Sequence, residues 1–234
     1  MPSATIFGGF MPSDALPKWE RLLSSAARLQ TILPSAVLVG GSAAALHVRH
    51  RFSRDADHVL VDLDKRFDAI LAELESVAGW KTARVRRPVM ILGSLDGIET
   101  GVRQLIRDLP LETVRIQCEG QELTVPTMAE ILRIKGVLIL KRNATRDYLD
   151  FVALADAMKE AAVIEALQRF DDIYPQPNNQ SALQQLQIQL VKPLPYDLDA
   201  TQLSEYKDLV SKWQNWANVE AVAARVSELL LECL

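Results

Sequence analysis

The chain has 234 residues, of which 49% are hydrophobic and 24% are charged, and this composition excludes a wholly disordered protein. A formal net charge of −4 excludes a protein that coats nucleic acid over its whole surface, so any contact with nucleic acid must be local. Two cysteines, Cys118 and Cys233, form neither a disulfide framework nor a zinc-binding pattern, which favours a reducing compartment. The apolar stretches are too short to span a bilayer and the N-terminus lacks a signal-peptide pattern, so we expect a cytoplasmic protein with no membrane partner.

Helices and short strands alternate in the first third of the chain. A helix is expected over residues 13–32, because apolar residues recur there at helical spacing. Residues 35–39 predict a buried strand. Residues 40–48 predict a tight turn that opens a short helix, since glycine permits unusual backbone angles and alanine favours helix. Residues 55–63 predict a second strand, and a further helix is expected over residues 64–77.

The pattern changes to strands from Trp80 to Thr124 and to helices after Pro126. Turns within the strand region are predicted at Gly93, Asp96-Gly97 and Glu119-Gly120. A basic cluster in the same region, residues 81–88, is interpreted as a solvated face. The helical part contains a linker at residues 172–181 and a break at residues 192–199. This order suggests an α+β core over residues 1–125, followed by a helical C-terminal region over residues 126–234.

Two aspartates stand at the start of the second predicted strand. Residues i and i+2 of a strand point to the same face, so Asp55 and Asp57 are expected side by side, with His58 on the opposite face. Paired carboxylates suit hard divalent cations, which prefer oxygen ligands. The alternative is an exposed pair of aspartates, each neutralised by a neighbour such as Arg51 or Arg54.

The stretch Gly40-Gly41-Ser42 lies between the first strand and the short helix. Glycine lets the backbone approach a ligand closely, and amides at the start of a helix favour phosphate. The Ser42 hydroxyl offers a further donor. The order of strand, GGS, short helix and D-x-D strand therefore predicts a phosphate cradle beside a metal site, whereas GGS by itself is also typical of an ordinary strand-to-helix turn.

This combination resembles the nucleotidyltransferase superfamily of the DNA polymerase beta type, and it is most similar to the AbiEii-like nucleotidyltransferases of bacterial abortive-infection toxin systems. The first motif, GG-small-x-x-x-L followed by R-x-S-x-D-x-D, is present as Gly40, Gly41, Ser42, Leu46, Arg51, Ser53, Asp55 and Asp57. The second motif, a lysine, an arginine and then R/K-D-x-x-D, is present as Lys135, Arg142, Arg146, Asp147 and Asp150. The resemblance covers roughly residues 35–155 and implies a polymerase-beta-like core, a mixed sheet with flanking helices.

The resemblance implies transfer of a nucleoside monophosphate from a nucleoside triphosphate to an acceptor hydroxyl. Asp55 and Asp57 would hold two magnesium or manganese ions, which clamp the attacking and leaving oxygens. Nucleotide phosphates would bind at the GGS stretch, with Arg51 and Ser53 beside it. The acceptor is an RNA end, a protein or a small molecule, and an antitoxin protein is an implied partner. The rival interpretation is a nucleotide-binding or interaction module that kept the fold and lost catalysis.

The second motif also has a physical interpretation. Lys135 and Arg142 are two helical turns apart and share a face, so they are candidates for binding triphosphate oxygens. Asp147 and Asp150 share a face of the next helix and are candidates for orienting those cations or for contacting the nucleotide. The alternative is a pair of helices joined by salt bridges.

The superfamily usually carries a third carboxylate on a nearby strand, and this sequence has no clean apolar-Asp-apolar strand in which to place it. Glu99 is the first candidate for a catalytic metal ligand and Asp96 is the second. On a strand, Glu99 shares a face with Arg103. Arg103 would then neutralise Glu99 in a degenerate site, or Glu99 would complete the metal site of an active enzyme.

Overall fold

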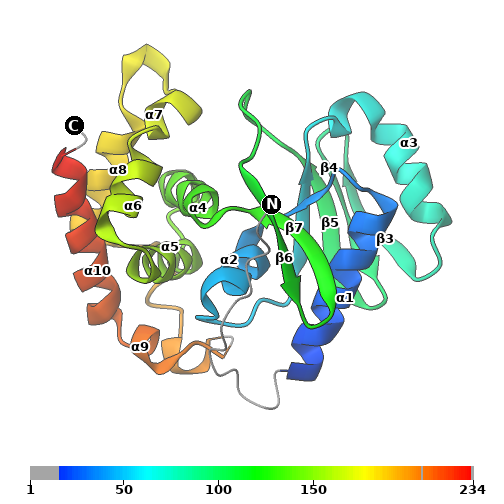
Figure 1. The fold of residues 1–234 in the computed structure, drawn as a ribbon, viewed down its shortest axis with the longest axis horizontal. Helices are drawn as coiled ribbons and strands as arrows, with labels where there is room; N and C mark the ends of the chain where they lie inside the picture. The colour runs from blue at the N-terminus through cyan, green and yellow to red at the C-terminus, as the bar shows by residue number, and fades with distance from the viewer. Residues whose placement is uncertain (1–15, 207, 233–234) are drawn as a thin grey trace. The chain divides into compact units, whose positions relative to one another are not determined.

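A computed structural model describes residues 16–206 and 208–232 of the chain (Figure 1). The predicted start of the first helix at Ser13 and the cysteine Cys233 lie outside the described residues. The chain divides into two compact units. Unit 1 comprises residues 1–106 and 110–127, and unit 2 comprises residues 107–109 and 128–234.

Unit 1 is built around a mixed five-stranded sheet in the order β1-β2-β5-β4-β3. Strands β2 and β5 are parallel, and the other neighbouring strands are antiparallel. Strands β6 and β7 form a separate hairpin. The elements of this unit are α1 (Leu16–Ile32), β1 (Val37–Leu38), α2 (Gly40–Val48), β2 (Ala56–Leu60), α3 (Leu63–Ser76), β3 (Trp80–Arg86), β4 (Met90–Leu95), β5 (Ile98–Gln104), β6 (Thr113–Cys118) and β7 (Gln121–Pro126).

The two faces of the five-stranded sheet differ in burial. Alternate residues of its strands, such as Leu60 and Ile91, are buried and pack with α1 and α3 in one apolar cluster. The residues between them, such as Asp57 and Leu92, are only half-buried. Because successive residues of a strand point to opposite faces, the sheet has an inner face against α1 and α3. We call the other face, which carries Asp57 and Leu92, the open face.

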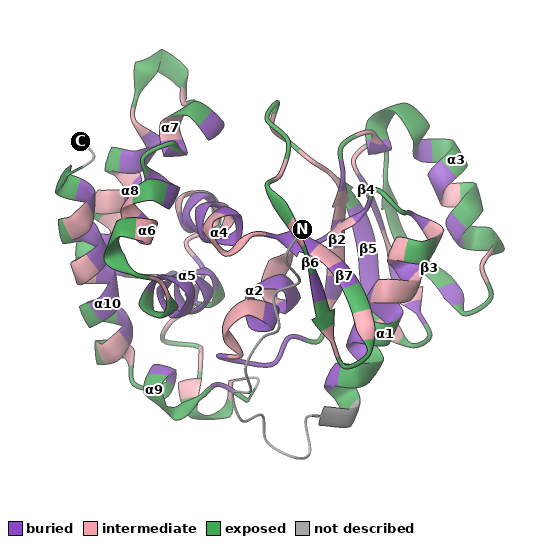
Figure 2. Cartoon of the chain, in the orientation of Figure 1, coloured by how far each residue is buried: buried purple, intermediate pink, exposed green. Residues whose placement is uncertain are grey.

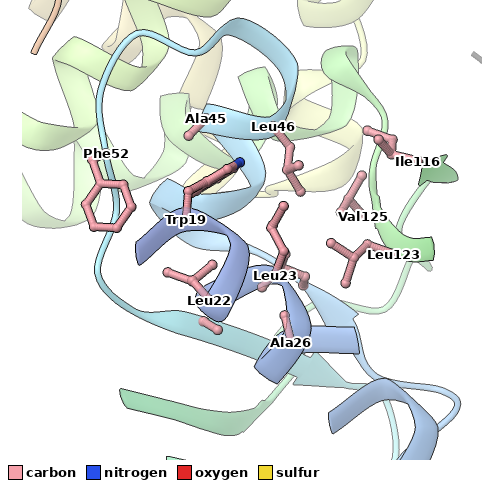
Figure 3. Close-up of a cluster of buried hydrophobic side chains, with 12 residues drawn as sticks. Trp19, Leu22, Leu23, Ala26, Ala45, Leu46, Phe52, Ile116, Leu123 and Val125 are labelled. Carbon is pink, nitrogen blue, oxygen red and sulfur yellow. The ribbon is translucent and has the colours of Figure 1, made fainter. Parts of the chain in front are cut away.

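A second apolar cluster joins α1, α2 and the β6–β7 hairpin. Figure 3 shows Leu23 of α1 directed toward Leu123 of the hairpin, with Leu46 of α2 beside it. Trp19 packs edge-on against Phe52 at a ring-centroid distance of 5.9 Å. Buried side chains of this kind each stabilise the fold by about 1.5–3 kcal/mol. The cluster therefore fixes α2, the helix that begins with the two glycines, against the rest of unit 1.

In the part of unit 2 that the structure describes, the regular elements are all helices. Most of α5 is buried, as Figure 2 shows, and a helix that is buried nearly all round forms the centre of its bundle. The neighbours that pack on α5 include α4 and α10. The elements are α4 (Met128–Arg142), α5 (Thr145–Ala157), α6 (Glu160–Leu167), α7 (Phe170–Ile173), η1 (Pro177–Asn179), α8 (Ala182–Val191), η2 (Leu203–Glu205), α9 (Ser211–Gln214), α10 (Trp216–Leu229) and η3 (Leu230–Glu232).

The mixed sheet with flanking helices and the helical C-terminal part confirm the predicted α+β fold class. One predicted turn is wrong, because Gly93 lies inside β4 and not between two strands. A Cβ atom at Gly93 would lie 2.5 Å from the Lys81 carbonyl oxygen and 2.8 Å from Trp80 Cζ2. The glycine therefore serves the close packing of Trp80 on the sheet. The turns at Asp96-Gly97 and Glu119-Gly120 are present, with positive φ at all four residues.

Candidate nucleotide and metal site

The two glycines of the GGS stretch meet separate steric requirements. Gly40 opens α2 with a φ of +76°, a conformation that residues with a side chain rarely adopt. A Cβ atom at Gly41 would overlap the Arg51 guanidinium and would lie 3.0 Å from Ser53 Oγ. Val39, the residue before the helix, provides no side-chain cap. The first amides of α2 therefore lie beside a buried arginine without a capping side chain, as an anion site requires.

Ser42 connects this turn to the acidic pair. Its side chain is fully buried, and its hydroxyl donates a hydrogen bond of 2.5 Å to the backbone carbonyl of Asp55. A hydroxyl has one proton to donate. In this arrangement Ser42 therefore holds the loop that carries Asp55, and the GGS stretch itself offers a phosphate its backbone amides, beside the Arg51 guanidinium.

The acidic pair lies directly against the GGS turn. Asp55 precedes β2 and Asp57 is its second residue, between the buried residues Ala56 and His58. The Val39 amide donates to the Asp57 carbonyl at 2.8 Å, and a Cβ atom at Gly40 would lie 4.0 Å from Asp57 Cβ. The structure thus brings the residues of the first motif together in unit 1: Gly40, Gly41, Ser42, Arg51, Ser53, Asp55 and Asp57.

The candidate third carboxylate lies on the open face of the same sheet. Asp57 is paired with Gly101 in the parallel register of β2 and β5, so the next position outward places Asp55 opposite Glu99. Glu99 is exposed. Asp96, the second candidate, lies in the turn before β5 and forms an ion pair with Arg28 at 2.5 Å. Glu99 is therefore the candidate that shares a face with Asp55 and Asp57.

Arg103 lies near Asp57, with 4.0 Å between its Nε and Asp57 Oδ1. Its Nη1 also lies 2.9 Å from the Met90 sulfur on the neighbouring strand. Among the ion pairs that the structure describes, the one that Arg103 makes is with Asp57 and not with Glu99. The site therefore contains a cation beside the acidic pair itself.

In the part of the chain that the structure describes, no group of three or more His, Cys, Asp or Glu side chains is placed to hold a metal ion. The donor set at the acidic pair is thus two carboxylates. Magnesium is commonly bound by one or two carboxylates together with substrate phosphates and water. Asp55 and Asp57 beside an anion-binding helix start therefore fit a metal that arrives with a nucleotide.

The second motif forms a buried cluster of charges in unit 2. Lys135 Nζ lies 2.6 Å from Asp150 Oδ2 and 3.7 Å from Asp147 Oδ1. Arg142 contacts both carboxylate oxygens of Asp147, at 2.7 and 3.1 Å. Lys135, Asp147 and Asp150 are buried, whereas Arg142 and Arg146 are exposed. The two carboxylates thus neutralise and orient Lys135 and Arg142, two of the three cations of the motif.

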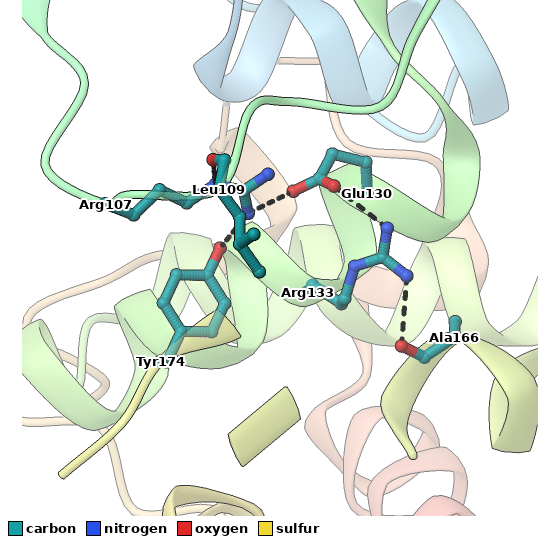
Figure 4. A network of polar contacts seen from close by, with 6 residues as sticks. All are labelled: Arg107, Leu109, Glu130, Arg133, Ala166 and Tyr174. Atoms are coloured by element: carbon teal, nitrogen blue, oxygen red, sulfur yellow. Dashed lines mark hydrogen bonds and ion pairs between the residues drawn. The ribbon is translucent and has the colours of Figure 1, made fainter. Parts of the chain in front are cut away.

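A second buried network in unit 2 had no signal in the sequence. Glu130, which is fully buried, accepts hydrogen bonds from Arg107 at 2.6 Å and from Arg133 at 2.9 Å (Figure 4). Arg107 also donates to Tyr174 Oη at 3.3 Å, and burial raises the pKa of Tyr174 to about 12. The network anchors residues 107–109 to the helices of unit 2, although they interrupt the sequence of unit 1.

Comparison with known families decides what kind of protein carries this arrangement. The model of the family described as "Nucleotidyl transferase AbiEii toxin, Type IV TA system" matches residues 21–221, which is most of the chain. The chain belongs to the AbiEii nucleotidyltransferase toxin family. The resemblance stated from the two motifs is thereby confirmed.

Solved structures share the fold of this AbiEii-family chain. JHP933 from Helicobacter pylori has a TM-score of 0.56 at 16% identity, over 95% of this chain and 94% of that one. MenT4, a nucleotidyltransferase toxin from Mycobacterium tuberculosis, has a TM-score of 0.50 at 18% identity, over 93% of this chain and 87% of that one. At such identities the likeness shows a common fold.

Curated relatives match the AbiEii-family chain over short parts of their own length. The heme uptake protein MmpL11 of Mycobacterium tuberculosis is 37% identical over 111 residues, 46% of this chain and 11% of that protein. The mycolic acid-containing lipids exporter MmpL11 of Mycolicibacterium smegmatis is 29% identical over 196 residues, 82% of this chain and 20% of that protein. The chain thus spans a fifth or less of these relatives. None of the helices that the structure describes is both long and apolar enough to cross a membrane.

Proposed function

We propose that this AbiEii-family chain is a metal-dependent nucleotidyltransferase that transfers a nucleoside monophosphate from a nucleoside triphosphate to an acceptor hydroxyl. The observation that carries the proposal is the attachment of the acidic pair to the GGS turn, through the bonds from Ser42 to Asp55 and from Val39 to Asp57. Phosphates at the start of α2 would lie beside both carboxylates. An RNA end, a protein and a small molecule all remain candidate acceptors.

The residues of unit 1 have separate roles in this reaction. The acceptor oxygen attacks the α-phosphorus, the bond to the β-phosphate breaks, and pyrophosphate leaves. Asp55 and Asp57 would hold magnesium or manganese, which neutralises developing charge on the phosphates. The α2 amides and Arg51 bind the leaving phosphates. Glu99 accepts the proton of the attacking hydroxyl, because it shares the open face with the acidic pair.

Unit 2 contributes to the proposal through its second motif. Lys135 and Arg142 are the candidates for binding triphosphate oxygens, as the resemblance implies. Lys135 lies between two buried carboxylates, at 2.6 Å from Asp150 and 3.7 Å from Asp147, so its side chain is oriented before a nucleotide arrives. The family description also supports a role as the toxin of a toxin–antitoxin pair, with an antitoxin as its partner.

Calorimetry with each nucleoside triphosphate, with and without magnesium, tests the proposal, followed by an assay of pyrophosphate release. We expect Asp55→Asn and Asp57→Asn to abolish magnesium-dependent binding. The control Asp68→Asn removes an exposed carboxylate of α3 and is expected to bind like the unaltered protein. Unchanged affinity and magnesium dependence in both site variants would show that the site is assigned to the wrong residues.

A catalytically degenerate nucleotide-binding module is the second candidate function. It is favoured by Arg103 beside Asp57 and by the lack of a three-residue metal group among the described residues. The same assays separate the two functions. Nucleotide binding that depends on Asp55 and Asp57, without pyrophosphate release across RNA, protein and small-molecule acceptors, would establish the binding module.

A further inference from the structure

The open face of the sheet carries three basic residues of β3 as well as the acidic pair. In the strand register, Lys81 pairs with Ser94, Arg84 with Leu92, and Arg86 with Met90. Those β4 residues pair in turn with Glu99, Gly101 and Arg103 of β5, and Gly101 pairs with Asp57 of β2. Paired residues point to the same side of a sheet. We call the side chains of Lys81, Arg84, Arg86 and Arg103 on this face the basic stripe.

A β-bulge is what places these three β3 cations on one face. The register shifts between Thr82 and Arg84, so Ala83 has no partner in β4. Without the bulge, the alternation of a regular strand would put Lys81 on one face and Arg84 and Arg86 on the other. The inner side of β3 agrees with this assignment, because Thr82 bonds to Glu75 of α3.

The basic stripe is exposed and largely uncompensated. Lys81, Arg84 and Arg86 are exposed and form no ion pair with another described residue, whereas Arg103 lies 4.0 Å from Asp57. The next residue, Arg87, behaves differently. It pairs with Asp68 of α3 and lies over the Phe67 ring, with 5.0 Å to the centroid. In a chain with a net charge of −4, three cations on one sheet face, without an ion-pair partner among the described residues, are a local concentration of positive charge.

Charged residues on an edge strand also prevent two sheets from joining edge to edge. That role requires charged side chains on β3 but does not require them to lie on a common face. The shared face with Asp55 and Asp57 is therefore the feature that edge protection leaves unexplained. Strand β3 lies three strand spacings from β2, or about 14 Å, a distance that about four stacked nucleotides cover.

We propose that the basic stripe binds the phosphodiester backbone of a single nucleic-acid strand and directs the end of that strand toward the acidic pair. Lysine and arginine side chains neutralise phosphates without reading sequence, so the stripe fixes position and not base identity. The idea that the basic stripe positions the acceptor strand rests on the proposed nucleotidyl transfer. The binding itself requires neither nucleotide nor metal, and this makes the two ideas separable.

Fluorescence anisotropy with a labelled single-stranded RNA of about 12 nucleotides tests the inference, without nucleotide or divalent cation. Three phosphate contacts predict a salt slope of about −2, or about 20-fold weaker binding at about 200 mM than at about 50 mM salt. The variant with Lys81→Gln, Arg84→Gln and Arg86→Gln should bind on the order of tenfold more weakly at low salt, with a nearly flat slope. A charge-matched control replaces exposed cations elsewhere in unit 1, with Lys18→Gln, Lys65→Gln and Arg115→Gln, and should keep the steep slope.

The inference is overturned if the unaltered protein does not bind the RNA, or if the stripe variant and the control variant bind it with equal affinity. Polyglutamate serves as an anion without phosphates, and the inference is also overturned if the stripe variant weakens the binding of polyglutamate but not of RNA. A single-stranded DNA arm shows whether the 2′-hydroxyl contributes, and stripe-dependent binding of either strand supports the inference. Asp55→Asn is expected to leave RNA binding intact or slightly tighter, because it removes a negative charge. Failure of the proposed reaction would therefore appear in the nucleotide assays and not in this one.

Discussion

His58 provides a quantitative test of how the acidic strand is built. It lies between the buried residues of the inner face, on the side opposite Asp57, and burial lowers its pKa from the ordinary 6.5 to about 4. The unfolded chain therefore binds a proton that the folded chain excludes. Stability from this group is complete above about pH 6.5 and is lost as the pH falls toward about 4. The difference between 6.5 and about 4 corresponds to about 3 kcal/mol of unfolding free energy, at about 1.36 kcal/mol per pKa unit.

The substitution His58→Leu should remove this pH dependence. The hydrogen bond from His58 to the Ala56 carbonyl is lost. That carbonyl still accepts a hydrogen bond of 2.5 Å from Thr100 Oγ1, so the substitution leaves no buried acceptor without a donor. Between about pH 7 and 4.5, the unaltered protein should lose about 2 kcal/mol more unfolding free energy than His58→Leu. Urea denaturation followed by circular dichroism measures this difference. Leu60→Val, which weakens the same strand and keeps His58, is the control. Equal pH dependence in His58→Leu and this control would refute a neutral buried histidine.

The remaining predictions concern the bonds that hold each motif. Ser42→Ala should lower the free energy of unfolding by about 1–3 kcal/mol, because the Asp55 carbonyl loses the hydrogen bond from Ser42; urea denaturation measures this loss. The same variant should bind a metal–nucleotide complex more weakly, which calorimetry measures. Lys135→Met should lower the free energy of unfolding by about 3–5 kcal/mol, because Asp147 and Asp150 stay buried without the lysine ammonium. In the same denaturation assay, the double variant with Asp150→Asn should recover part of this loss. A Lys135→Met variant as stable as the unaltered protein would show that the cluster is not buried.

Features that depend on neighbouring residues were predictable from the sequence. Residues 40–48 form the predicted tight turn and short helix, with a positive φ at Gly40, because the glycines and alanines of this stretch favour that local backbone. The opposite faces of Asp57 and His58 follow from strand alternation, which is also local. The candidate site is accordingly best predicted where its residues are one to three positions apart.

Features that depend on contacts between distant segments were not predictable. The bulge at Ala83 is set by how β3 pairs with β4, and the sequence alone favoured a plain solvated face for the basic cluster. Gly93 resembled a turn, because the sequence does not show that Trp80 must pack against it. The bond between Arg107 and Glu130 joins residues 23 positions apart in two different parts of the chain. No periodic pattern in the sequence of either segment indicates this bond.

The open face separates charge in a way that suits one kind of ligand. Its β2 side holds Asp55 and Asp57, with Glu99 opposite Asp55, and its β3 side holds three cations of the basic stripe, Lys81, Arg84 and Arg86. Anions and cations that only stabilised the sheet would lie on adjacent strands as cross-strand pairs. Here two strands separate Asp57 of β2 from the three cations of β3, and the fourth cation of the stripe, Arg103 of β5, lies 4.0 Å from Asp57. A ligand with a cation at one end and phosphates along its length is complementary to both sides, and a nucleic-acid strand that meets a metal-bound nucleotide has this distribution of charge.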